Sequence, residues 1–277
     1  MPNRLSELWR AATGTRSPRT RTARTAPALD PVRLVYPNEP PLVYAVGDVH
    51  GRLDLLKRLE ETIVQDRADL RQPALLVLLG DLVDRGPSSA QVLDHVLSRP
   101  PDGIERVCLL GNHEALMLGF VANPRPDSMW LDQGGRETLL SYGIPAAMLE
   151  RPTRRSLAQA LRAYVPDEHL EFLRGMPVLL QTPTHIYVHA GIDSALSIED
   201  QSTDTLLWYR DDFVETYEGL GHRVVHGHSF IGEPLVTDHR IAVDTGAYRT
   251  GTLSAVALSP GSAPRILSVT QASWVAG

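Results

Sequence analysis

The order of apolar runs in the first half of the chain constrains its fold more than any other feature. Short runs at 42–46, 74–79 and 104–110 have the length and the apolar content of buried strands. Each is followed by a stretch with apolar residues at helical spacing, such as Leu56 and Leu59 in the first stretch. A strand–helix order that occurs three times in succession predicts a parallel α/β sheet.

The second half of the chain has a different pattern. Residues of about 123–177 include two amphipathic stretches, which predict a mostly helical insertion. Beyond them, seven short runs indicate a second sheet, largely antiparallel, packed against the first. We therefore predict an α/β fold, a two-sheet β-sandwich flanked by helices, as a single domain over 39–277. The seven runs are VLLQ, HIYVHAG, RVVHGHS, PLVTD, RIAVDTGA, TLSAVAL and RILSVT.

The N-terminal segment 1–38 is rich in Arg, Thr, Pro and Ala and has few residues that could build a core. It is expected to be a basic, mostly disordered tail. A transit-like segment and a tether for an acidic partner stay open as alternatives. It lacks the apolar region of a secretory signal, and no stretch of the chain approaches the ~20 apolar residues of a membrane span.

Composition narrows the class of protein. The formal net charge of −6 and the pI near 5.9 argue against a general nucleic-acid binder, which normally has a basic face. The only cysteine, Cys108, lies in an apolar run and is expected to be a core residue. No disulfide framework is possible, so a reducing compartment such as the cytoplasm fits best.

Polar clusters follow all three strands of the first half: GDVHG at 47–51, GDLVDRG at 80–86 and GNHE at 111–114. Functional groups of open α/β sheets gather at the carboxyl ends of the strands, so these clusters should face one crevice. HAG at 189–191 and HGH at 226–228 follow strands of the second half. The side chains expected in the crevice are Asp48, His50, Asp81, Asp84, Arg85, Asn112, His113, His189 and His228.

Carboxylates, imidazoles and an amide, without a thiolate, suit Mn, Fe or Zn rather than an iron–sulfur or structural zinc site. The candidate ligands are Asp48, His50, Asp81, Asn112, His189 and His228. These are too many for one ion that also leaves room for a substrate. Two ions with a bridging carboxylate would use them all, and Asp81 of the middle motif is the natural bridge. A lone GD after a strand is often only a turn or a helix cap, but five motifs at successive strand ends favour a site.

Taken together, the motifs GDVHG, GDLVDRG, GNHE, HAG and HGH resemble those of the calcineurin-like metallophosphoesterase superfamily, and within it the bacterial phosphoprotein phosphatase family. The resemblance covers about residues 42–258 and implies a metallophosphoesterase fold with two divalent metal ions at the sheet edges. By this resemblance Mn²⁺ is expected, with Fe or Zn as alternatives. Asp48 and His50 would hold the first ion, Asp81 would bridge, and Asn112, His189 and His228 would hold the second.

The resemblance also implies roles beyond metal binding. His113 would be the general acid, Asp84 would orient it, and Arg85, Arg210 and Asn112 would bind the phosphate. Many metallophosphoesterases end in a G-H-x-H motif, but here Phe230 stands in place of the second histidine. His226 then precedes the ligand on its strand, and a position lining the site stays open for it.

The expected activity is that of a phosphomonoesterase acting on phosphoserine or phosphothreonine by direct attack of a metal-bound hydroxide. Phosphotyrosine and small phosphoesters are further candidate substrates. The alternative is a symmetrical dinucleoside polyphosphate (diadenosine tetraphosphate) hydrolase, whose motifs tend to read GDLVARG and GNHD. Asp84 and Glu114 favour the phosphatase, whereas VDTGAYRTGTLSA and WLDQGGRETLLSYG occur near both families. A metal-dependent regulatory protein without activity is the third reading, against which the complete ligand set argues.

Overall fold

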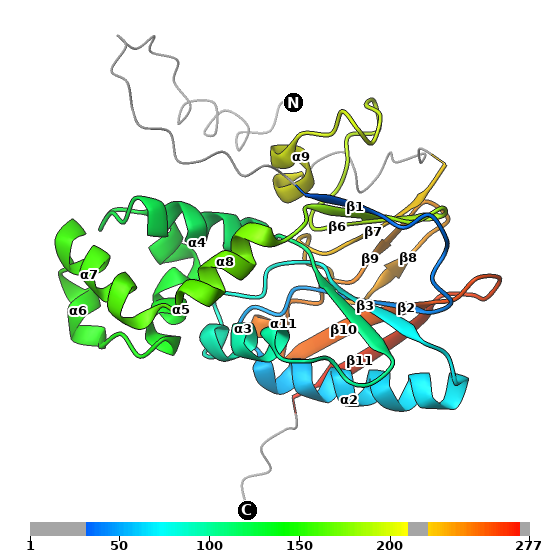
Figure 1. Ribbon diagram of the computed structural model, residues 1–277, viewed down its shortest axis with the longest axis horizontal. Coiled ribbons are helices and arrows are strands. Elements are labelled where there is room, and N and C mark those ends of the chain that lie inside the picture. The colour runs from blue at the N-terminus through cyan, green and yellow to red at the C-terminus, as the bar shows by residue number, and fades with distance from the viewer. Residues whose placement is uncertain (1–31, 210–220, 272–277) are drawn as a thin grey trace, which may run out of the picture.

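A computed structural model describes residues 32–209 and 221–271 of the chain. Two mixed β-sheets pack against each other, and helices lie outside the sandwich and at one end of it (Figure 1). The buried layer between the sheets contains apolar residues of both, such as Val77 and Leu79 from one and Tyr187 and Val225 from the other.

The five-stranded sheet contains the strands expected from the first half of the chain. Its β2, β3 and β4 are parallel, and β10 pairs antiparallel with both β2 and β11. Val46, Leu78 and Cys108 are paired across the three parallel strands, so these strands end at one edge. The order is β11 (Arg265–Thr270), β10 (Thr252–Leu258), β2 (Val43–Val46), β3 (Ala74–Leu78) and β4 (Ile104–Cys108).

The six-stranded sheet is mixed, so the prediction of a largely antiparallel second sheet is wrong. The pairs β1–β5, β6–β7 and β7–β9 are parallel, whereas β5–β6 and β8–β9 are antiparallel. Val188, His226 and Ala242 are paired across the central strands and bring their ends to the same edge. The order is β1 (Arg33–Val35), β5 (Leu179–Gln181), β6 (His185–Val188), β7 (Arg223–His226), β9 (Arg240–Ala242) and β8 (Leu235–Val236).

Two further expectations about strands need correction. The runs TLSAVAL and RILSVT form β10 and β11 in the five-stranded sheet, not in the second sheet. β10 is buried on both faces: Ala255 packs with the helix-covered core, and Val256 packs between the sheets. In addition, β1 lies inside the expected tail 1–38, so residues 33–35 of that segment form a strand; residues 1–31 lie outside the described part.

Helices complete the sandwich. The helix α2 packs along β10 and β11, and a group of short helices fills most of 123–177, the segment expected to be helical (Figure 1). Within residues 32–209 and 221–271, no helix has the length and apolar character needed to span a membrane. The helices are α2 (Leu53–Leu70), α3 (Ser89–Leu97), α4 (Asn112–Ala122), the π-helix η1 (Leu131–Gly135), α5 (Arg136–Ser141), α6 (Ala146–Glu150), α7 (Arg154–Tyr164), α8 (Asp167–Gly175), α9 (Thr203–Trp208) and α11 (Ala247–Thr250).

Candidate metal centre

The structure brings the predicted site residues together at the aligned strand ends. They follow β2, β3, β4, β6 and β7, so both sheets contribute. Arg85 is half-buried, and Arg210 lies outside the described residues. The others are all buried: Asp48, His50, Asp81, Asp84, Asn112, His113, His189 and His228.

Backbone strain is concentrated in these loops. Non-glycine residues rarely adopt a positive φ, which costs free energy. Among the described residues, Arg71 at the end of α2 is the one such residue outside the site. A strained backbone that persists at one place shows that the surrounding contacts fix the loops. The strained site residues are His50 (φ 43°), Asp81 (51°), Asp84 (73°), Arg85 (67°) and His228 (59°).

The glycines of the second and third motifs let two loops touch. A Cβ at Gly111 would lie 2.3 Å from the backbone N of Asp81, and a Cβ at Gly80 would lie 2.7 Å from the backbone N of Gly111. Gly80 also has φ 101°, which side-chain-bearing residues avoid. Glycine is therefore required here because the backbones after β3 and β4 are in direct contact.

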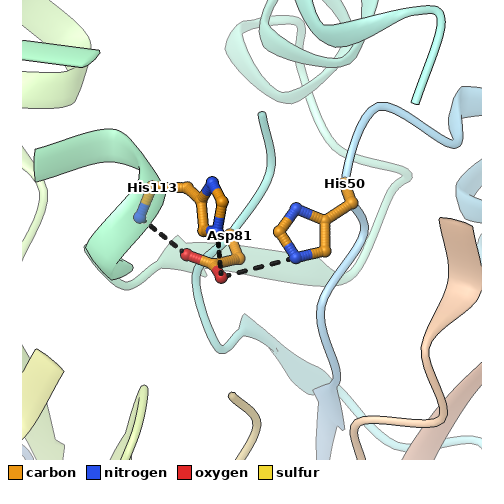
Figure 2. Close-up of side chains that lie close together, drawn as sticks. All are labelled: His50, Asp81 and His113. Atoms are coloured by element: carbon orange, nitrogen blue, oxygen red, sulfur yellow. Dashed lines mark hydrogen bonds and ion pairs between the residues drawn. The ribbon is translucent and has the colours of Figure 1, made fainter. Parts of the chain in front are cut away.

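Asp81 lies between two groups of potential ligands. The first group is His50 and His113, and the second is Asn112, His189 and His228. Figure 2 shows its carboxylate between the rings of His50 and His113. Its Oδ2 is 3.5 Å from Nε2 of His50 and 3.9 Å from Nε2 of His113. Its other oxygen, Oδ1, is 3.4 Å from Nε2 of His189. The two oxygens thus face different histidines, as a bridging carboxylate would.

The second group is tighter than the first. Asn112 Oδ1 lies 2.8 Å from His189 Nε2 and 3.0 Å from His228 Nδ1, and the two ring nitrogens are 3.1 Å apart. Asp48 lies beside both groups: its Oδ2 is 3.9 Å from Nε2 of His50, and its Oδ1 accepts a hydrogen bond from the backbone N of His228 at 3.0 Å. All six expected ligands therefore meet in one buried cluster.

The chemistry of these donor atoms fits a metal ion. His189 Nδ1 lies 2.9 Å from the carbonyl oxygen of Leu79, which can only accept, so Nδ1 has the proton. Burial lowers the pKa of His189 to about 4, so the ring is neutral and Nε2 presents a lone pair. That lone pair faces the acceptor oxygen of Asn112. Two acceptors at 2.8 Å repel each other unless a cation binds both, and an imidazole held through its other nitrogen is the usual arrangement of a metal ligand.

Buried carboxylates give the same indication. Burial raises the pKa of Asp81 to about 6. Burial, with the neighbouring charges of Asp244 and Asp81, raises the pKa of Asp48 well above its usual value. Several carboxylates held together away from water are unfavourable as anions, and divalent cations offset that cost.

Arg85 lies across the first group. Its Nη1 donates to His50 Nε2 at 2.6 Å, and its Nη2 lies 2.8 Å from His113 Nε2. The Arg85 guanidinium also lies 4.8 Å from the ring centroid of Tyr248, an exposed side chain of α11. A cavity of about 550 Å³ adjoins Arg85 and Tyr248 and is bounded on its other side by η1 and the start of α5. A phosphoester group could reach Arg85 from this cavity.

His113 is held by Asp84. Its Nδ1 donates to Asp84 Oδ2 at 2.6 Å, which leaves Nε2 directed toward Arg85 and Asp81. Burial raises the pKa of Asp84 to about 7, an effect opposed by hydrogen bonds from Thr138 and Trp130 and by the charge of Arg85. The pair has the form of an imidazole and the carboxylate that orients it.

Three further residues lie at or near the site: two were not predicted from the sequence, and the position of the third was left open. Asp244, at the end of β9, was missed: it is buried, it interacts with Asp48, and it accepts from the backbone N of Gly246 at 2.9 Å. A carboxylate directly after a strand, in VDTGA, was the signal that could have found it. Tyr248 was missed because an exposed tyrosine has no distinctive sequence pattern. His226 ends β7 and is buried, with Nδ1 3.0 Å from the carbonyl oxygen of Gly227, and it belongs to neither ligand group among the described residues.

Glu114, noted in the sequence only as a family marker, clamps the loops after β3 and β4. Its Oε1 accepts from the backbone N of Leu82 and Val83 at 2.7 and 3.1 Å. Its Oε2 accepts from Asp81 and Gly111, both at 2.9 Å. One buried carboxylate thus satisfies four backbone donors and fixes the loop that holds Asp81.

Replacing Glu114 by Gln should destabilise the protein by roughly 2–4 kcal/mol, because the amide NH₂ would face two backbone donors. We expect a fall in Tm of roughly 5–10 °C and weaker metal uptake, measured by thermal unfolding and metal titration. Glu61→Gln on the exposed side of α2 is the matched control and should change neither. An unaltered Tm in Glu114→Gln would show that the clamp contributes nothing.

Comparison with known proteins agrees with this site. The sequence pattern described as "Calcineurin-like phosphoesterase" matches residues 41–248. The Salmonella typhimurium protein named Serine/threonine-protein phosphatase 1 is 27% identical over 217 residues, covering 76% of this chain and 89% of that protein. The Oceanobacillus iheyensis protein named Bis(5'-nucleosyl)-tetraphosphatase PrpE [asymmetrical] is 26% identical over 231 residues, covering 76% and 86%.

A crystal structure provisionally assigned as a diadenosine tetraphosphatase has the same fold. It superposes with a TM-score of 0.62 at 22% sequence identity and covers 86% of this chain and 97% of that one. At this identity the likeness concerns the fold alone. The match of the sequence pattern, in contrast, spans the five motifs that contribute the two groups of potential ligands.

Proposed function

The chain belongs to the calcineurin-like phosphoesterase family, and from this premise we propose that it is a dinuclear-metal phosphomonoesterase for phosphoserine and phosphothreonine. It is a metallophosphoesterase with a buried cluster of His and Asp residues that could hold metal ions. The observation that supports a monoesterase is the row of Asp84, His113 and Arg85 beside the ligand groups: Arg85 can bind a phosphoryl group, and His113 can protonate its leaving oxygen.

The proposed ligands follow the two groups around Asp81. Asp48 and His50 would hold one ion, Asn112, His189 and His228 would hold the other, and Asp81 would serve both. Two such ions would supply positive charge at the phosphoryl oxygens and would make a water molecule more acidic at neutral pH. Oxygen and imidazole donors suit Mn²⁺, with Fe and Zn as alternatives.

Side chains of the protein would bind the phosphate and protonate the leaving group. The guanidinium of Arg85 matches the geometry of phosphate oxygens and is pre-aligned by stacking on Tyr248. His113 would give the proton of its Nε2 to the leaving alkoxide, while Asp84 keeps the other ring nitrogen protonated and the ring in place. Arg210, from the sequence LLWYRDDF, is proposed as a second phosphate ligand on sequence grounds alone.

A dinucleoside polyphosphate hydrolase is the second candidate. Its support is the name of a relative, an asymmetrical bis(5'-nucleosyl)-tetraphosphatase, at nearly the same identity as the serine/threonine phosphatase. The motifs suggested the symmetrical enzyme as the alternative, whereas the name of this relative specifies asymmetrical cleavage. Both candidates would use the same ligand groups, so the leaving group decides between them.

The test is phosphate release by Mn²⁺-loaded protein from phosphoserine, phosphothreonine and phosphotyrosine peptides, measured beside the products formed from diadenosine tetraphosphate. A chelator-treated sample and the Asp81→Asn variant control for contaminating phosphatases. Peptide turnover well above that of the dinucleotide supports the proposal. Preference for the dinucleotide favours the second candidate, and turnover of neither contradicts both.

A further inference from the structure

We infer that Trp130 and Thr138 are positioning residues that hold the Asp84 carboxylate, and through it His113, in the orientation needed for proton transfer. Both come from the helical segment 123–177, which contributes none of the expected metal ligands. The inference deepens the proposed function and rests on the proposed role of His113. It also assigns a role to the stretch WLDQGGRETLLSYG, whose mechanism was not evident from the sequence.

Each oxygen of Asp84 has its own donor from this segment. Trp130 Nε1 donates to Oδ2 at 2.7 Å, and the hydroxyl of Thr138 donates to Oδ1 at 2.6 Å. His113 Nδ1 donates to the same Oδ2 at 2.6 Å. A carboxylate held at both oxygens cannot rotate without losing a charge-assisted hydrogen bond, so the ring of His113 is fixed as well.

Burial makes these bonds strong constraints. Asp84 and Thr138 are 0% exposed and Trp130 is 1% exposed, so water cannot replace a lost donor. Thr138 Oγ1 also accepts from the backbone N of Asp84 at 2.9 Å, which ties side chain and main chain of the aspartate to one residue of α5. The Trp130 ring is itself held by packing against Phe120, with ring centroids 4.7 Å apart.

The backbone between the two residues is shaped for this contact. It includes η1, whose helical course is broken by a kink at Gly134. Gly134, at φ 109°, approaches the turn of Asp84 so closely that a Cβ would lie 2.4 Å from the backbone N of Arg85. A Cβ on Gly135 would lie 2.4 Å from a carbon of the Trp130 indole. The two glycines thus allow η1 to lie directly against the Asp84–Arg85 turn.

The test replaces Trp130 by Phe, which removes the N–H donor and keeps an aromatic ring in the same space. On a phosphoserine peptide, whose alkoxide needs a proton, kcat should fall ~10-fold with KM unchanged. On p-nitrophenyl phosphate, whose phenolate leaves without a proton, kcat should change less than ~2-fold. A merely structural role would lower both rates equally, and that result would overturn the inference.

Thr138→Val should show the same dependence on the leaving group, and Thr138→Ser, which retains the hydroxyl, should restore most of the rate. Tyr44→Phe is the matched control. It removes another hydrogen bond from a fully buried aromatic side chain to a carboxylate, that from Tyr44 on β2 to Asp66 on α2 at 2.5 Å, a bond that involves neither Asp84 nor His113. It should leave both rates unchanged.

A measurement without metal or substrate separates this inference from the proposed function. In the NMR spectrum of the metal-free protein, the indole N–H of Trp130, assigned by its loss in Trp130→Phe, should exchange slowly and shift in Asp84→Asn. A signal that does not respond to Asp84→Asn overturns the inference whatever the activity. If the signal responds but His113→Asn loses both rates equally, the acid role of His113 is wrong, and the catalytic part of the inference with it.

Discussion

Replacing Asp81 by Asn should empty both metal positions and lower turnover by at least ~10³-fold. Each carboxylate oxygen faces a different histidine, His50 at 3.5 Å and His189 at 3.4 Å, so no other expected ligand links the two groups in this way. The amide offers one oxygen and one NH₂, which cannot bind a cation, and charge neutralisation at the phosphoryl group is lost. Metal content by mass spectrometry and phosphate release measure the two effects.

Thermal unfolding gives an independent readout of the same change. For the wild type, adding Mn²⁺ at about 100 times its Kd should raise Tm by roughly 5–10 °C, because the ion binds the folded state. In Asp81→Asn that rise should be nearly absent. The metal-free variant should unfold no earlier than the metal-free wild type, because burial raises the pKa of Asp81 to about 6 and its anion is unfavourable there without a cation.

Asp127→Asn is the control with the same change of charge, at an exposed aspartate paired with Arg125. It should retain metal content, activity and the metal-dependent rise in Tm. Two bound metals per chain in purified Asp81→Asn would contradict the bridging role. The two ions would then have to be held without the Asp81 carboxylate.

The first half of the fold could be predicted because its strands are buried and parallel. Such strands are continuous apolar runs, and helical periodicity marks the connections between them. The second half was harder to predict, because the sequence of a short strand does not indicate which of the two sheets contains it. The run TLSAVAL indicates a strand buried on both faces, but only the three-dimensional pairing of Ala255 with Val46 shows which sheet contains it.

The sequence predicted the ligand residues of the site better than the residues that hold those ligands in place. Every expected ligand lies in the described part of the chain and belongs to the same buried cluster, because the motifs are read directly from strand ends. Asp244, Trp130 and Thr138 were not among the predicted residues. Asp244 has a local signal, since it follows a strand, but Trp130 and Thr138 act on Asp84 from more than 40 positions away in sequence, and no local pattern encodes such a contact.

His113 could act either as a general acid or as a metal ligand, and a variant can distinguish the two roles. The proposed acid also lies 3.9 Å from Asp81 and belongs, with His50 and Asp81, to a cluster that could hold an ion (Figure 2). Geometry alone therefore permits both a general acid and a ligand. On the other side of the ring, Nδ1 donates to the buried carboxylate of Asp84 at 2.6 Å, an arrangement that both roles share, so a variant must decide between them.

His113→Asn should retain both metals and lose turnover in proportion to the need for a proton. On phosphoserine peptides kcat should fall ~10²–10⁴-fold, the usual contribution of a general acid, whereas p-nitrophenyl phosphate should lose far less. Asp84→Asn should show the same dependence with a smaller loss, since the imidazole remains but its orientation is no longer fixed. If His113→Asn retains only one metal per chain and loses both rates equally, His113 is a ligand, and the proton must come from another group or from water.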